Sequence, residues 1–226
     1  MDFLTDNIEE SVRQILATIP PGVILLAAAK TRTKEEVEAV IRGGVTHIGY
    51  NYIQEALPII QAIGGKVKWH MIGHLQRNKA KIAIKNFDMI ETVDSWDLAQ
   101  TLDRYCEGMQ KSMLVLVEVN SGKESSKTGV LPEMVENLLI QMSSLNHLHV
   151  EGLMTMGPRF GDPEDSRPYF QKTREIYDRL AVMDLQNVRM QYLSMGMSNS
   201  YQIAIEEGAN IIRIGSKLFG ERYNNQ

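Results

Sequence analysis

The sequence has few cysteines and no long apolar run, and each shortage excludes a class of protein. Cys106 is the only cysteine among 226 residues, so no internal disulfide can form and a reducing compartment is expected. No apolar run approaches the roughly 20 residues of a membrane-spanning helix. The first residues show no basic stretch followed by an apolar core, as a secretory signal would. We therefore expect a cytoplasmic protein with no membrane partner.

Excess charge and clustered metal ligands are also missing. The formal net charge is only −4, which gives no reason to expect a nucleic-acid partner. His70 and His74 are four residues apart, but they span the predicted end of a strand, so the spacing of a helical pair of metal ligands does not apply. Because no further histidine or cysteine cluster is present, the sequence predicts no metal site.

Strand-like and helix-like segments alternate along the whole chain. The hydrophobic content of 43% and charged content of 23% are those of an ordinary folded domain. We expect strands over residues 23–29, 46–50, 68–73, 87–91, 112–120, 148–154, 188–193 and 210–215. We expect helices over residues 6–18, 33–43, 51–63, 77–85, 95–108, 132–142, 168–183 and 199–207.

This alternation predicts an α/β fold. Eight is the number of parallel strands that closes a barrel, and no linker or shift in composition interrupts the pattern. The sequence therefore predicts a single (β/α)₈ barrel, a TIM barrel, over residues 1–226, with one leading N-terminal helix. An open doubly wound sheet is disfavoured because nothing resembles the glycine-rich first turn of a dinucleotide-binding unit.

One predicted helix has clear signals at both ends. Thr33 followed three residues later by Glu36 is the pattern of a capping box, in which each residue's side chain binds the other's backbone N–H. Gly43 and Gly44 then end the apolar periodicity, as glycine commonly does at a helix C-terminus. The helix is therefore expected to follow the first strand directly.

The first predicted strand is the most informative stretch, because residues 23–29 are all small or apolar and run directly into Lys30. Such a run is typical of a strand buried on both faces of a parallel sheet, and ligands bind at the carboxyl ends of such strands. A lysine against apolar walls loses part of its preference for the charged form, and its neutral amine can form a Schiff base with an aldehyde or ketone. The alternative is that Lys30 only extends into solvent. All loops that follow barrel strands open on one face, so Asn51, His74 and Asn120 are expected near Lys30.

Two turns rich in glycine and serine follow the seventh and eighth predicted strands. In barrels the loops at these positions often bind phosphate through backbone N–H groups. Ser198 is expected to cap a helix beginning near Asn199, and Gly215 with Ser216 would supply a second set of donors. The alternative is an ordinary helix cap followed by a strand-end turn.

Arg213 lies inside an otherwise apolar predicted strand, where an unpaired guanidinium would be very costly. It is expected either to pair with Glu91 or Glu118 on other strands or to face a ring nitrogen of a bound heterocycle, and spacing does not separate these interpretations. A Schiff-base lysine together with a phosphate site describes a binding site for a phosphorylated aldehyde. Pyridoxal 5′-phosphate fits that description, and a phosphosugar aldolase fits it too.

Seven short motifs, spread in order over nearly the whole chain, form a recognisable set. They are AAKT (28–31), NYIQE (51–55), WHMIGHLQRNK (69–79), SKTG (126–129), GLM (152–154), LSMGMS (193–198) and RIGSKLFG (213–220). In these motifs the chain closely resembles the pyridoxal phosphate homeostasis protein family, also called the alanine racemase N-terminal-domain-like or proline synthetase co-transcribed family. The resemblance implies a single (β/α)₈ barrel like that of alanine racemase, with pyridoxal phosphate bound as an internal aldimine.

The resemblance also assigns roles to residues. It implies that Lys30 is the aldimine lysine and that Arg213 faces the pyridine nitrogen. Ser198, Gly215 and Ser216 would hold the phosphate. The complete set of expected cofactor-binding residues is Lys30, Asn51, Met71, His74, Ser194, Ser198, Arg213, Gly215 and Ser216.

Two positions depart from the family's usual pattern. Ala29 stands where the family usually has serine before the lysine, and Tyr50 stands where it usually has glutamate. Neither departure removes a group on which the aldimine depends. They leave open which polar contacts surround the ring and whether the missing carboxylate has an acid-base role.

The family is described mainly as proteins that hold pyridoxal phosphate and balance its level and amino-acid levels, without an established catalytic reaction. A racemase needs two bases on opposite faces of the aldimine, and alanine racemases take the second from an added C-terminal β domain. A chain ending at Gln226 is expected to lack that domain. We therefore expect a monomeric, non-catalytic cofactor-holding protein with no established catalytic residue, whose recipients are pyridoxal-phosphate-dependent apoenzymes. A weak amino-acid racemase and a Schiff-base aldolase acting on a phosphosugar are the alternatives.

Overall fold

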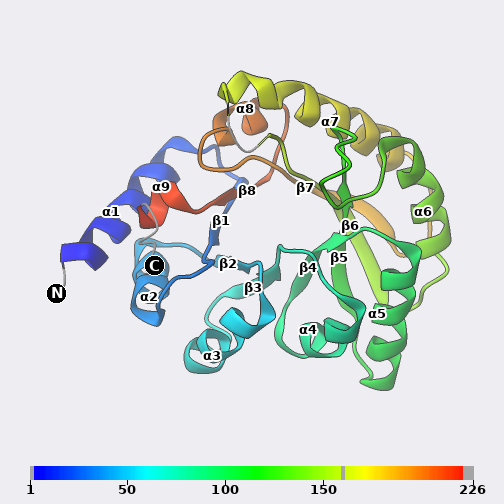
Figure 1. The fold of residues 1–226 in the computed structure, drawn as a ribbon, viewed down its shortest axis with the longest axis horizontal. Helices are drawn as coiled ribbons and strands as arrows, with labels where there is room; N and C mark the ends of the chain where they lie inside the picture. The colour runs from blue at the N-terminus through cyan, green and yellow to red at the C-terminus, as the bar shows by residue number, and fades with distance from the viewer. Residues whose placement is uncertain (1–2, 159–160, 221–226) are drawn as a thin grey trace.

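The computed structural model describes residues 3–158 and 161–220, and its strands close into a single parallel barrel (Figure 1). Each strand pairs with the next in chain order, and the last pairs with the first. The strands are β1 (Ile24–Ala28), β2 (His47–Tyr50), β3 (Lys68–Met71), β4 (Met89–Val93), β5 (Met113–Val119), β6 (Leu148–Thr155), β7 (Val188–Ser194) and β8 (Ile211–Ile214). The predicted (β/α)₈ barrel is confirmed.

The helices form a layer around the outside of this barrel (Figure 1). They are α1 (Phe3–Thr18), α2 (Lys34–Gly43), α3 (Ile53–Ile63), α4 (Ala80–Asn86), α5 (Trp96–Gly108), α6 (Val135–Met142), α7 (Arg167–Ala181), α8 (Tyr201–Glu206) and α9 (Ser216–Phe219). In the described part of the chain, three 3₁₀ turns accompany them: η1 (Arg77–Lys79), η2 (Pro132–Met134) and η3 (Pro163–Ser166). The predicted leading helix is confirmed as α1, which packs against α2 and α9. Within the described ranges no helix has both the length and the apolar character needed to cross a membrane.

Successive side chains along each strand point to opposite sides of the barrel wall, because the strand repeats every two residues. In β1, Leu25 and Ala27 belong to the large apolar layer between strands and helices. Leu26, which lies between them in sequence, packs instead with Ile72 and Ile211 in a separate cluster inside the barrel. The position of a residue along its strand therefore decides whether it faces the helices or the barrel interior.

The predicted capping box is present at the start of α2. The backbone N–H of Glu36 donates to Thr33 Oγ1 at 3.3 Å, and the Glu36 carboxylate accepts from the Thr33 backbone N–H at 2.7 Å. At the other end Gly44 has a φ of 116°, a left-handed conformation that glycine adopts readily. Both end signals are confirmed, and the helix follows β1 after a short turn.

Some element bounds differ from the prediction. The basic segment expected as one helix over residues 77–85 divides into the 3₁₀ turn η1 and the helix α4. The third strand ends at Met71 rather than at residue 73, and Gly73 passes close to the end of β2. A Cβ on Gly73 would lie 2.3 Å from the backbone oxygen of Asn51, so this crossing requires glycine.

Gly152 provides a test of how tightly β6 and β7 pack. Its φ is 146°, and a Cβ at this position would lie 1.8 Å from the backbone oxygen of Tyr192. Gly152→Ala must displace a paired strand, and we expect it to lower the free energy of unfolding by about 2–4 kcal/mol in urea denaturation.

Gly108→Ala is the matched control for this substitution. Gly108 ends α5, and a Cβ there would meet no atom within 4 Å. The expected change is within about 1 kcal/mol and in the stabilising direction, because alanine favours helix over glycine. Equal effects of the two substitutions would contradict the close approach of β6 and β7.

Candidate functional site

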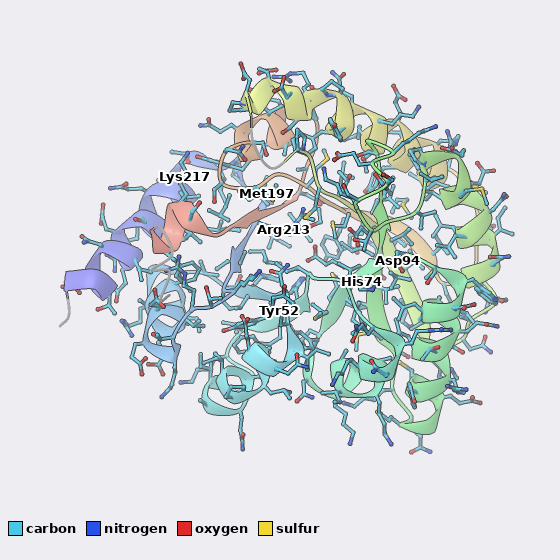
Figure 2. The ribbon with its side chains drawn as sticks, viewed as in Figure 1. Tyr52, His74, Asp94, Met197, Arg213 and Lys217 are labelled. Atoms are coloured by element: carbon cyan, nitrogen blue, oxygen red, sulfur yellow. The ribbon has the colours of Figure 1, made fainter. Side chains whose placement is uncertain are left out.

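The carboxyl ends of the eight strands, and the residues directly after them, form one end of the barrel, which we call the mouth. Lys30 follows β1, Asn51 follows β2 and Gly215 follows β8. Figure 2 shows Arg213 between two groups of labelled residues, with Tyr52, His74 and Asp94 on one side and Met197 and Lys217 on the other. The closed barrel therefore brings residues from widely separated parts of the sequence together at the mouth.

Lys30 lies half-buried at the mouth, beside an exposed aromatic ring. Its Nζ is 4.8 Å from the centroid of the Tyr52 ring, and Tyr52 is 50% exposed. The next residue, Thr31, has a φ of 63°, which is unusual for a β-branched residue. The Thr31 backbone N–H donates to the Glu55 carboxylate at 2.9 Å and thereby holds this turn. The amine of Lys30 is thus kept at the mouth by a sharply turned backbone.

The turns after β7 and β8 are joined through Ser198. The backbone N–H groups of Gly215 and Lys217 donate to Ser198 Oγ, at 3.2 and 3.4 Å. The prediction that Ser198 caps the following helix is therefore wrong. That helix, α8, begins at Tyr201 with Ser200 before it, so Ser198 lies too far back to reach its first turn. Its hydroxyl lies against the β8 turn instead.

The predicted phosphate residues Ser198, Gly215 and Ser216 are therefore adjacent. A Cβ on Gly215 would meet nothing closer than the backbone oxygen of Ala28 at 3.5 Å. Ser216 and Lys217 are exposed, and Lys217 Nζ lies 4.8 Å from the centroid of the Tyr201 ring. The backbone N–H groups of Gly215 and Lys217 point at Ser198 Oγ, and the Ser216 hydroxyl and the Lys217 ammonium are exposed beside them.

A chain of hydrogen bonds crosses the interior of the barrel below the mouth. Arg213 is 4% exposed, and its Nη1 donates to Ser194 Oγ at 2.8 Å and its Nη2 to the Thr155 backbone oxygen at 2.9 Å. Ser194 Oγ donates to Glu91 Oε2 at 2.6 Å. Glu91 Oε1 is hydrogen-bonded to His70 Nδ1 at 2.7 Å. Of the two carboxylates expected to pair with Arg213, Glu91 is thus linked to it through the Ser194 hydroxyl.

The charges in this chain stabilise one another. Burial alone would raise the pKa of Glu91, but His70, Arg213 and Ser194 together hold that pKa below its ordinary value. Burial lowers the pKa of Arg213, and the negative charge of Glu91 is the largest influence opposing that shift. Glu91 is therefore the anion that balances the buried Arg213 cation.

Sequence reasoning missed His47 and His70 as members of this interior. Their rings meet edge to face with centroids 5.2 Å apart. Burial and the neighbouring His70 lower the pKa of His47 to about 4, so His47 is neutral at neutral pH. The signal that was available is an ionisable residue inside a predicted strand, as with His70 between Trp69 and Met71 in β3 and Glu91 in β4.

Met71 does not join the other expected cofactor-binding residues. Its side chain is 2% exposed and belongs to the apolar layer between strands and helices. Its neighbour His70 points to the opposite side of the wall, into the barrel. The side chain of Met71 is directed away from the mouth by the two-residue repeat of β3, and we leave it out of the proposed site.

The remaining residues expected to bind the cofactor differ in their exposure and in the hydrogen bonds they already make. Asn51 is half-buried at the end of β2, and Ser194 is fully buried and committed to Glu91 and Arg213. The side chain of His74 is 52% exposed, with Nδ1 3.4 Å from Asp94 Oδ2. Among the described residues, no group of three or more metal-ligating side chains could hold a metal ion.

The two positions that depart from the family's pattern both face the helix layer. Ala29 is fully buried there, and Tyr50, 1% exposed, packs beside Trp69 with ring centroids 6.4 Å apart. Burial and the charges of Glu55 and Glu36 raise the pKa of Tyr50. Neither side chain points into the barrel, so neither is placed to contact a ligand there directly.

Glu91→Gln tests the buried charge balance. Removing the anion leaves Arg213 as an uncompensated buried cation, and we expect the free energy of unfolding at pH 7 to fall by about 3–5 kcal/mol in urea denaturation. Because the folded pKa of Glu91 is lowered, its contribution is present above about pH 4.5 and is lost as the pH falls further. The difference in free energy of unfolding between the wild type and Glu91→Gln should therefore shrink as the solution becomes more acidic.

The matched control is Glu38→Gln, which breaks an exposed pair with Lys34 at 3.4 Å. Its expected effect is within about 0.5 kcal/mol at any pH in this range. A Glu91→Gln variant as stable as the control would show that Arg213 does not depend on Glu91.

Comparison with known proteins gives the family. The model of the family described as alanine racemase, N-terminal domain, matches residues 4–223. A pyridoxal phosphate homeostasis protein of Aquifex aeolicus is 41% identical over 199 residues, which cover 88% of this chain and 86% of that protein. The protein with the same name from Mus musculus is 36% identical, with 97% and 86% covered.

Solved structures agree with this result. PipY of Synechococcus elongatus, solved with pyridoxal phosphate bound, has 32% identity and a TM-score of 0.86, covering 94% of this chain and 100% of that chain. An alanine racemase of Clostridium difficile has a TM-score of 0.78 at 16% identity, covering 97% of this chain and 61% of that one, which shows a shared fold. The chain belongs to the pyridoxal phosphate homeostasis protein family, whose barrel is that of the N-terminal domain of alanine racemase.

Proposed function

We propose that this chain holds pyridoxal 5′-phosphate on Lys30 and serves in intracellular pyridoxal phosphate and amino-acid homeostasis, without catalytic turnover. The observation that carries the proposal is the position of Lys30, at the mouth of the same barrel in which the relative PipY binds pyridoxal phosphate. We further propose that the chain is one functional domain, acts as a monomer in the cytoplasm and supplies the cofactor to apoenzymes that require it.

The residues of the mouth fit the three reactive features of this cofactor. Pyridoxal phosphate supplies an aldehyde, a phosphate and a ring nitrogen. The amine of Lys30 bonds to the aldehyde carbon with loss of one water. Ser198, Ser216 and the backbone at Gly215 meet the phosphate, where a residue without a side chain lets its oxygens approach the backbone.

Arg213 supports a holding role rather than a catalytic one. It is a buried cation below the mouth, and its Nη1 and Nη2 are fixed by Ser194 and Thr155. A fixed positive charge disfavours a proton on a nearby ring nitrogen. An unprotonated ring withdraws electrons less strongly, so it activates a bound amino acid less.

The openness of the mouth supports the same role. Tyr52 is 50% exposed, and the side chain of His74 is 52% exposed. Water therefore reaches the region around Lys30, whereas efficient proton transfer on a reactive carbon needs water to be excluded. The contact between Tyr52 and Lys30 is the one observation that favours a weak racemase, because the Tyr52 hydroxyl is a candidate second base.

Lys30→Ala tests the holding role. Wild-type protein incubated with pyridoxal phosphate should show the visible absorption band of the lysine-bound cofactor, and borohydride should fix the cofactor to the chain in a mass spectrum. The variant should show neither, because no other amine is held at that position. Lys34→Ala is the matched control, since Lys34 is an exposed lysine of α2 that pairs with Glu38. A wild-type protein that stays colourless would overturn the proposal.

Turnover is tested with the loaded protein and each L-amino acid in deuterium oxide. We expect no catalytic exchange of the α-proton, measured by nuclear magnetic resonance, because the open mouth does not protect a proton transfer. Repeated exchange that disappears in Tyr52→Phe would establish the racemase alternative. Cleavage of a phosphosugar by protein without pyridoxal phosphate would instead establish the aldolase alternative.

A further inference from the structure

One carboxylate oxygen inside the barrel lacks a partner among the described residues. Glu118 of β5 is 4% exposed, and its Oε1 accepts a hydrogen bond from Thr128 Oγ1 at 2.9 Å. Its Oε2 is fully buried and makes no hydrogen bond. Buried polar atoms are nearly always paired, because an unmade hydrogen bond costs free energy. This oxygen is therefore a candidate position for a bound ligand.

The direction of the side chain follows from the repeat of β5. Val117 and Val119 belong to the apolar layer under the helices, whereas Leu116 packs inside the barrel with Met89 and Met154. Glu118 shares the side of Leu116, so it points into the barrel one residue before the strand ends. The loop that follows β5 carries Thr128, which closes over one carboxyl oxygen.

The charges around Glu118 come from three other strand ends. Arg213 of β8 and His74 after β3 favour its ionised form, and Asp94 after β4 disfavours it. Burial has the largest effect, and the pKa of Glu118 is raised. A protonated carboxyl carries one acceptor oxygen and one O–H donor. Because Thr128 donates to Oε1, a proton held by this carboxyl would lie on Oε2.

The other polar groups nearby are already committed. The Asn120 side chain donates from Nδ2 to the Glu124 backbone oxygen at 2.8 Å and accepts at Oδ1 from the Glu124 backbone N–H at 3.0 Å. Ser194 and the Thr155 backbone oxygen hold Arg213. Glu118 is thus the inward-facing side chain near the end of β5 that has a free hydrogen-bonding atom.

We propose that Glu118 is a further cofactor-binding residue, which donates a hydrogen bond from Oε2 to an acceptor atom on the ring of the bound cofactor. This inference rests on the proposed function. Strand β5 lies four strands from β1 in an eight-stranded barrel, so Glu118 is across the barrel from Lys30. Lys30 holds the aldehyde end of the ring, the turns after β7 and β8 hold the phosphate, and Glu118 fixes the ring from the opposite wall.

Two substitutions at Glu118 test whether this position must carry a hydrogen-bond donor. Glu118→Gln keeps the neutral pattern, because the amide oxygen accepts from Thr128 and the amide N–H₂ donates in place of Oε2. Glu118→Leu removes both groups. In absorbance titrations with pyridoxal phosphate, we expect the dissociation constant to stay within about threefold for Glu118→Gln and to rise about five- to tenfold for Glu118→Leu.

The stability of the cofactor-free variants supplies a second readout. Glu118→Leu removes a buried carboxyl that is only half satisfied, so its midpoint of urea denaturation should equal or exceed that of the wild type. If Glu118 were needed only for folding, Glu118→Leu would instead lower this midpoint. Glu133→Gln, which breaks an exposed pair with Lys123 at 3.1 Å, is the control that should change neither binding nor stability.

Three results would overturn the inference. They are unchanged binding by Glu118→Leu, binding by Glu118→Gln as weak as that of Glu118→Leu, and a loss of cofactor-free stability in Glu118→Leu that accounts for its weaker binding. The proposed function is judged separately by wild-type protein and Lys30→Ala. Wild-type binding together with unchanged Glu118→Leu binding overturns only the role of Glu118.

Discussion

The two-residue repeat of strands in a closed barrel is the constraint on which this structure depends. A closed wall has only an inside and an outside, so each strand residue faces either the barrel interior or the helix layer. His70, Glu91 and Arg213 face inward and form one connected set, whereas Met71 and Tyr50 face outward. The same repeat that builds the apolar core therefore selects which polar groups lie below the mouth.

The inward polar groups are stable because they satisfy one another. Arg213 and Glu91 are both buried, and Ser194 stands between them, accepting from one and donating to the other. Buried charges are tolerated only with such partners, since unpaired they would be expelled or neutralised. The result is a fixed cation at a set depth in the barrel. Under the proposed function, this guanidinium lies below the ring nitrogen of the cofactor.

The mouth itself is less completely satisfied than the interior. Ser198 receives its two N–H groups at 3.2 and 3.4 Å, and Glu118 has one oxygen with no partner in the described structure. Lys30 Nζ lies over the exposed ring of Tyr52. Groups that bind a ligand reversibly are commonly left with weak contacts in its absence, because strong internal partners would compete with it. The interior groups therefore bond mainly to one another, whereas groups at the mouth keep long or unmade hydrogen bonds.

The sequence alone determined the barrel, its leading helix and the position of Lys30 at a strand end, because these depend on local periodicity and on glycine, serine and apolar runs. It also placed two serine and glycine turns after the last two strands. Only the tertiary structure decided that Ser198 meets the β8 turn, that Met71 faces the helices and that Glu118 keeps a free oxygen. Ser194 and Glu91 are 103 residues apart, and Arg213 and Thr155 are 58 apart. Such contacts leave no local pattern, since only closure of the barrel brings those strands face to face.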